Sequence, residues 1–223
     1  MILREEFFGG IKINDYIIAL TSNKYSQNGE DKIIFYNNNS KKIFVGVKGY
    51  SFTKSQTNLS LISNINDDNK KLLICACTKY VENQKNGILL IRIEFDDREE
   101  DKIFEVFYET NFKVHCFCPI LESKNKNDIL DIKRKVITKF FFVGGYNKLN
   151  NEGLIKLYKI NYNENDFDKT GIEYIKDIEI ENEKINFNGP INCMIQSKLN
   201  WKIILTNMDG SVYLFSSPNI INY

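Results

Sequence analysis

Several features that are common in enzymes and exported proteins are scarce in this sequence of 223 residues. It contains one histidine, so the side chain that most often serves in general acid–base catalysis is nearly absent. No apolar run approaches the ~18 residues that a membrane-spanning helix needs. The five cysteines are an odd number and do not indicate a secreted disulfide framework.

An excess of charge of one sign and a targeting segment are also lacking. The chain has 30 basic and 29 acidic residues, and its net charge of +1 gives no general attraction to nucleic acid. The first ten residues, MILREEFFGG, contain no apolar segment of signal-peptide length, because Glu5 and Glu6 interrupt them early. We therefore expect a cytoplasmic or nuclear protein without a membrane segment.

Short β-rich runs bounded by Gly, Asn and Asp are abundant, whereas helical periodicity is scarce. Four of these runs are followed by a polar loop containing Gly and then by a second apolar run, which is the pattern of a β-hairpin. The first runs lie at 15–22, 71–78, 139–146 and 201–207, and the second runs at 31–36, 87–95, 153–160 and 210–215. The similar spacing of the copies indicates a repeat architecture.

Further apolar runs flank the hairpins and bring most units to four antiparallel strands. The last copy, residues 189–215, has apolar strands around Asp209-Gly210 and an aromatic residue at Phe215, and it resembles a WD-repeat blade. Neither a Gly-His nor a Trp-Asp dipeptide occurs in the chain. The resemblance implies an all-β fold, a β-propeller of four-stranded antiparallel blades. One domain would cover 1–223, with blades at approximately 10–50, 57–110, 113–181 and 189–215, the last completed by 2–8.

The number of units leaves two arrangements open, because propellers usually have ~4–8 blades. One is a small closed ring of about four blades, in which residues 2–8 supply the missing strand. The other is a segment of a larger propeller that a partner chain or further sequence completes.

Two cysteine pairs occupy alternate positions of strands in neighbouring units. Alternate residues of a strand face the same side, so four thiols would suit tetrahedral Zn²⁺ if they converged. The other interpretation is that these cysteines fill the core, which Cys193 in the last unit supports. The residues are Cys75, Cys77, Cys116 and Cys118, with His115 nearby.

We predict neither a metal nor a cofactor from these patterns. His115 and Cys116 are neighbours in a strand and would point to opposite faces, which is wrong for a catalytic pair. The carboxylate clusters at 96–101 and 179–183 are typical of solvated loops. The polar insertion at 122–136 is either a flexible insert or a partner-binding loop.

The loops between the two strands of each hairpin would open on one face of a propeller. Three of them begin with tyrosine close to lysine, and the fourth carries methionine. Tyrosine and methionine are enriched at protein interfaces, so we predict a partner-binding ring there. The alternative is that each tyrosine packs on its own loop. The residues are Lys24, Tyr25, Lys79, Tyr80, Tyr146, Lys148 and Met208.

The resemblance implies a non-catalytic scaffold for protein–protein interaction, within a larger complex. A second hypothesis is a small-ligand-binding or enzymatic propeller that uses the central channel. It would need converging carboxylates or histidine on the inner strands, which instead carry Leu, Ile, Cys and Met. A third is a propeller of an RNA-processing complex with RNA contacts, and the near-neutral charge argues against it.

Overall fold

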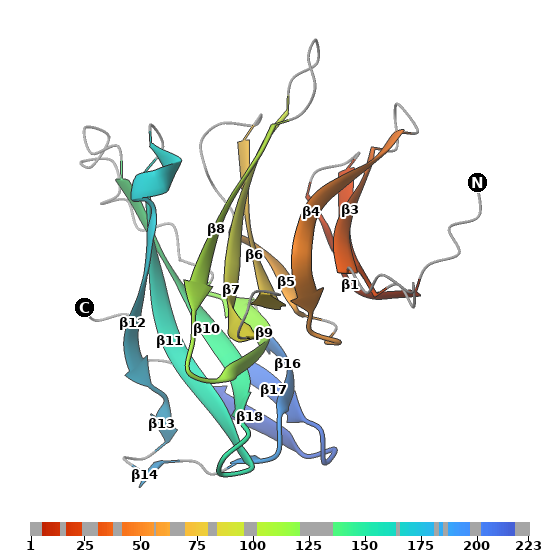
Figure 1. Cartoon of the computed structure of the whole chain (residues 1–223). Coiled ribbons are helices and arrows are strands. Elements are labelled where there is room, and N and C mark those ends of the chain that lie inside the picture. The colour runs from red at the N-terminus through yellow and green to blue at the C-terminus, as the bar shows by residue number, and fades with distance from the viewer. Residues whose placement is uncertain are drawn as a thin grey trace.

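The fold is described from a computed structural model of the chain (Figure 1). The residues that the structure describes are 6–13, 17–23, 31–37, 42–55, 57–62, 70–79, 84–95, 102–120, 136–163, 166–180, 183–184, 187–196 and 202–216. Strands dominate these ranges, and the helical element within them is the 3-10 helix η2 (Phe167–Lys169). No helix in these ranges has the length and apolarity to cross a membrane. The predicted all-β fold of antiparallel sheets is confirmed.

Four successive antiparallel groups of strands, which we call units 1 to 4, make up most of the fold. Unit 1 comprises β1 (Glu6–Lys12), β2 (Ile17–Asn23), β3 (Asp31–Asn37) and β4 (Lys42–Phe52). Unit 2 comprises β5 (Leu59–Ile62), β6 (Lys70–Lys79), β7 (Lys85–Glu94) and β8 (Lys102–Glu109). Unit 3 comprises β9 (Lys113–Pro119), β10 (Val136–Asn147), β11 (Glu152–Asn163) and β12 (Gly171–Asp177). Unit 4 comprises β16 (Ile191–Gln196), β17 (Lys202–Asn207) and β18 (Val212–Ser216).

Units 1 and 2 share one sheet, whereas units 3 and 4 form separate sheets. The link between units 1 and 2 is the end of β4, where Tyr50 to Phe52 pair with the end of β6. β5 pairs with the other part of β6. Three short strands connect unit 3 to unit 4, namely β13 (Glu179–Ile180), β14 (Glu183–Lys184) and β15 (Phe187–Asn188). β13 pairs with β14, and β15 pairs with the start of β11.

The units stack face to face, because their central strands are apolar on both sides. In β6, Leu73 and Cys75 face unit 1, while Leu72 and Ile74 face unit 3. Successive residues of a strand point to opposite faces. An unbroken apolar run is therefore what a strand buried on both sides requires, and it explains the sequence LLICAC.

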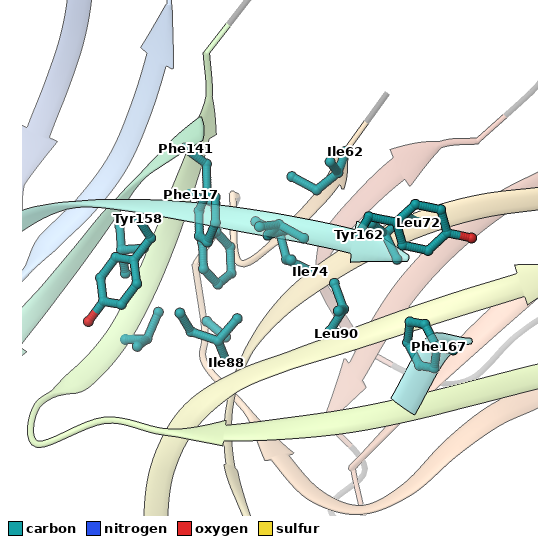
Figure 2. Packing of buried hydrophobic residues seen from close by; sticks show 14 of the residues in the cluster. Ile62, Leu72, Ile74, Ile88, Leu90, Phe117, Phe141, Tyr158, Tyr162 and Phe167 are labelled. Atoms are coloured by element: carbon teal, nitrogen blue, oxygen red, sulfur yellow. The ribbon is translucent and has the colours of Figure 1, made fainter. Parts of the chain in front are cut away.

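Three apolar clusters fill the spaces between successive units. Cluster 1, between units 1 and 2, includes Ile33, Phe35, Leu73, Leu89 and Ile91. Cluster 2, between units 2 and 3, includes Leu72, Ile74, Leu90, Phe117, Phe141 and Tyr162 (Figure 2). Cluster 3, between units 3 and 4, includes Cys116, Phe142, Leu157, Met194 and Leu205. Burying one large aliphatic side chain stabilises a fold by about 1.5–3 kcal/mol, so these clusters hold the stack together.

The first strands of the units, β1, β5, β9 and β16, are neighbours in that order. The connection from β4 to β5, described at residues 53–55 and 57–58, runs past them, and we call it the crossing segment. The Thr53 N–H donates to the carbonyl of Ala76 in β6 (3.1 Å). The Thr53 hydroxyl donates to the carbonyl of Val114 in β9 (2.8 Å). The Ser55 hydroxyl donates to the carbonyl of Asn192 in β16 (2.5 Å), so the crossing segment ties together units 2, 3 and 4.

Part of the segment 2–8, which was expected to complete the last unit, belongs to unit 1 instead. Glu6 and Phe7 pair with β2, a bulge follows between Phe7 and Gly9, and β1 then continues through Gly9 to Lys12. A Cβ atom at Gly9 would collide with the side chain of Asn58 in the crossing segment. Glycine therefore allows close packing here and does not end the strand, which sequence patterns alone do not reveal. The first residues of the segment lie outside the described ranges.

The glycines of the hairpin turns have two different roles, although the sequence suggested one. Gly210 has a φ of 89°, as expected of a residue that lets a tight turn form. In the turn before Gly153 the residue with positive φ is Asn151, at 52°. A Cβ atom at Gly153 would collide with Phe187, and one at Gly87 would collide with the outer strand β8. These two glycines allow close approach of neighbouring segments.

Candidate interaction surface

The predicted ring of turn residues can be followed at four of its seven positions. Those in the described residues are Lys79, Tyr146, Lys148 and Met208, and those outside them are Lys24, Tyr25 and Tyr80. The β10–β11 and β17–β18 turns both lie at the lower end of the molecule in Figure 1. Lys79 ends β6, and its ammonium lies 5.7 Å from the ring centroid of Phe107 in β8.

The β10–β11 turn is stabilised by its own side chains. The Tyr146 hydroxyl donates to the side-chain oxygen of Asn151 (2.7 Å). The backbone N–H of Leu149 donates to the side-chain oxygen of Asn147 (3.0 Å). Tyr146 thus packs on its own turn, while Lys148 and Leu149 project outward, and Leu149 is 93% exposed.

The β17–β18 turn is organised by two consecutive side-chain acceptors. Asn207 Oδ1 accepts a hydrogen bond from the Asp209 N–H (3.2 Å), and Asp209 Oδ1 accepts one from the Ser211 N–H (2.7 Å). Hydrogen bonds from Ser211 to the carboxylate lower the pKa of Asp209. Met208 stands at this turn with 66% of its surface exposed.

The two turns are fixed to the same short segment, residues 187–190. β15 in this segment pairs with the start of β11, directly after the β10–β11 turn. The buried side-chain amide of Asn207 donates to the carbonyl of Asn188 (3.0 Å), and the Met208 N–H donates to the carbonyl of Pro190 (3.0 Å). Turns from units 3 and 4 therefore form one surface. We call it the paired-turn surface and define it by the exposed residues Lys148, Leu149 and Met208.

The cysteine pairs do not converge on one site. Cys75 and Cys77 lie in cluster 1, whereas Cys116 and Cys118 lie in cluster 3, on the far side of unit 3. Burial raises the pKa of all four thiols, that of Cys118 to about 12. Within the described ranges, no group of three or more His, Cys, Asp or Glu residues is placed to hold a metal ion.

His115 is the extra residue of a β-bulge in β9. Gly144 pairs with Cys116 and Gly145 with Val114, so His115 is skipped in the pairing. Its ring is buried edge-on near Tyr146, with centroids 6.5 Å apart, and its Nε2 atom has no hydrogen-bond partner. Burial, with repulsion from Lys113 as a second cause, lowers the pKa of His115 to about 4. A buried neutral imidazole of this kind is a poor general base.

The remaining sequence features are placed only in part. The carboxylate cluster 96–101 lies outside the described residues. Residues 122–135 of the insertion 122–136 also lie outside them, and its last residue, Val136, is the first residue of β10. Within 179–183, Ile180 pairs with Glu183 in the short β13–β14 hairpin.

The sequence indicated the β10–β11 and β17–β18 turns, but it did not indicate the segment 187–190 that joins them. Leu149 was not singled out, although a large apolar residue in the polar stretch NKLNN is a recognisable signal. The role of Asn207 was also missed, because its partner Asn188 belongs to a different connection.

No protein-family model matches the chain, and no curated protein matches its sequence. The WD-repeat resemblance therefore rests on residues 189–215 alone.

Proposed function

We propose that the chain is a non-catalytic scaffold for protein–protein interaction, built on a propeller-like order of blades. Three features support the blade interpretation. The units are antiparallel and mostly four-stranded, they stack face to face, and their first strands are neighbours in order. Blades of a propeller are arranged in the same way around their centre.

The paired-turn surface is the observation that carries the proposal. Leu149 and Met208 are exposed apolar side chains on two turns from different units that hydrogen bonds hold to one segment. An ordered surface loses little conformational entropy when a partner binds, and Leu149 and Met208 offer that partner apolar area. Lys148 adds a positive charge beside them.

Two observations favour a scaffold over a catalytic or ligand-binding centre. The single histidine is buried with its pKa lowered to about 4, and the thiols of cluster 1 and cluster 3 are buried with raised pKa values. Near the first strands, the hydroxyls of Thr53 and Ser55 are engaged with backbone carbonyls and are not directed to a ligand. A cytoplasmic or nuclear location is part of the same proposal.

Affinity purification from native cells with matched variants tests the paired-turn surface. The wild-type chain should recover a defined set of partner proteins. Replacing Leu149 and Met208 together with Glu should reduce that recovery at least about tenfold, because burial of two apolar side chains is lost. The matched control is Tyr174→Glu, since Tyr174 is a large exposed side chain on β12, outside both turns and outside unit 4.

Equal recovery by the double variant and by the wild type would refute the proposed role of the surface. Recovery of the chain alone, without any partner, would count against the scaffold itself. Thermal unfolding of each variant separates loss of binding from loss of fold, and both substitutions are at exposed positions.

A further inference from the structure

β18 is the third strand of unit 4 and lies at the edge of its sheet in the part of the chain that the structure describes. In the other units the third strand pairs on the corresponding side with a fourth strand: β4 pairs with β3, β8 with β7 and β12 with β11. Among the described residues, the outer edge of β18 therefore carries a row of backbone donors and acceptors of the kind that a fourth strand covers in the other units.

The composition of β18 differs from that of the outer strands of units 2 and 3. β18 reads VYLFS and carries no charge. Charged side chains on an outer strand discourage pairing with another chain, and β18 lacks this protection. The other two outer strands have it: β8 contains Lys102, Glu105 and Glu109, and β12 contains Glu173, Lys176 and Asp177.

The sheet beside this edge is apolar on both faces. On the outer face Ile195, Ile204 and Leu214 lie side by side across β16, β17 and β18, and Leu214 is 59% exposed. On the inner face Tyr213 packs edge-on against Phe187, with ring centroids 4.9 Å apart. A strand added to β18 would place apolar side chains next to apolar neighbours on both faces.

We propose that β18 binds an extended, uncharged and mainly apolar segment of a partner protein as an antiparallel fourth strand. This proposal extends the proposed scaffold function. It depends on that function in one respect, namely that the bound segment belongs to another protein. The occupant is a strand and not the sheet of a second copy, because the exposed large apolar side chains on the described outer face of unit 4 are a small group, Ile195, Ile204, Val212 and Leu214. A stable interface between two folded copies covers about 800 Å² on each. Strand addition draws its affinity from main-chain hydrogen bonds.

A synthetic peptide tests this edge on the full chain. In the probe, isoleucine alternates with threonine and a lysine stands at each end for solubility. The probe should bind the wild-type chain and slow amide hydrogen exchange in residues 212–216. A control peptide with methyl groups on alternate backbone nitrogens keeps the side chains and loses half of the donors, so it should not bind.

A matched pair of variants locates the binding. Leu214→Lys should weaken the peptide at least about tenfold, since Leu214 would be covered by the added strand. Leu149→Lys makes the same change at a more exposed leucine of the paired-turn surface and should leave the affinity unchanged.

Several results would overturn the inference. These are an absence of peptide binding at millimolar concentration, equal binding of the N-methylated control, and equal effects of the two leucine variants. Protection, in the free protein, of those 212–216 amides that point away from β17 would also overturn it, because the edge would then be occupied by this chain or by a second copy. The peptide assay does not involve Met208, so the paired-turn proposal and this one can fail separately.

Discussion

Acidification should destabilise the fold through His115. The pKa of this side chain is lowered from 6.5 to about 4 by burial, so the folded chain holds the imidazole neutral where the unfolded chain would protonate it. The unfolded state then binds more protons than the folded state, and stability falls as pH decreases from about 6.5 to about 4. A shift of this size corresponds to about 2 kcal/mol lost at pH 5 and about 3 kcal/mol below pH 4.

Urea unfolding at pH 7.5, 6 and 5 measures this loss, with His115→Gln as the reference. The difference in free energy of unfolding between the two proteins should change by about 2 kcal/mol from pH 7.5 to pH 5. The reference is needed because Asp31 and Glu105 act in the opposite direction: burial raises their pKa, and their protonation stabilises the folded chain.

Proton NMR gives an independent measurement, because the sequence contains one histidine and its ring resonance is unambiguous. In the folded protein that resonance should not move until the pH approaches 4. A titration midpoint near 6.5, or the same pH dependence of stability in the wild type and His115→Gln, would refute the reasoning.

Two further predictions concern packing and the paired-turn surface. Gly144→Ala should destabilise the fold by about 1–3 kcal/mol in urea unfolding, since the added Cβ would overlap Cys116 Sγ. Gly171→Ala is the control, because no neighbouring atom lies within 4 Å of a Cβ there, and an equal effect would contradict the packing argument. Asn207→Ala should cost about 0.5–1.5 kcal/mol in free energy of unfolding, because it removes the hydrogen bond to the Asn188 carbonyl. It should also weaken partner recovery although Asn207 is itself buried, and unchanged recovery would show that the turns need no anchor.

The strands were predictable because their signal is local. Successive residues of the run LLICAC in β6 belong alternately to cluster 2 and cluster 1. Each apolar residue therefore indicates by itself that its position is buried. The described hairpins were also predictable from nearby Gly, Asn and Asp, although Gly87 and Gly153 lie within β7 and β11 and not at the turn centres. The bulge at His115 was not, because it depends on how Gly144 and Gly145 pair with a strand that the chain forms some 30 residues earlier.

For the paired-turn surface, too, the local features were predictable from the sequence and the long-range contacts were not. The sequence placed Tyr146, Lys148 and Met208 in turns, and the structure describes Lys148 and Met208 in turns and Tyr146 near the end of β10. Which turns form one surface depends on residues 187–190, a connection without a recognisable motif. The separation of the cysteine pairs likewise follows from which face of each strand meets which neighbour, and spacing within one strand does not determine that.

The crossing segment has a consequence for how the protein is made. Ser55 donates its hydroxyl hydrogen to the carbonyl of Asn192, and 137 residues separate them in the chain. A ribosome adds roughly 5–20 residues per second, so Asn192 is synthesised about 7–27 s after Ser55. During that time the early units emerge with this contact unmade. The crossing segment therefore lacks its tie to unit 4 until Asn192 has been synthesised, and units 2 and 3 have to hold it without that contact.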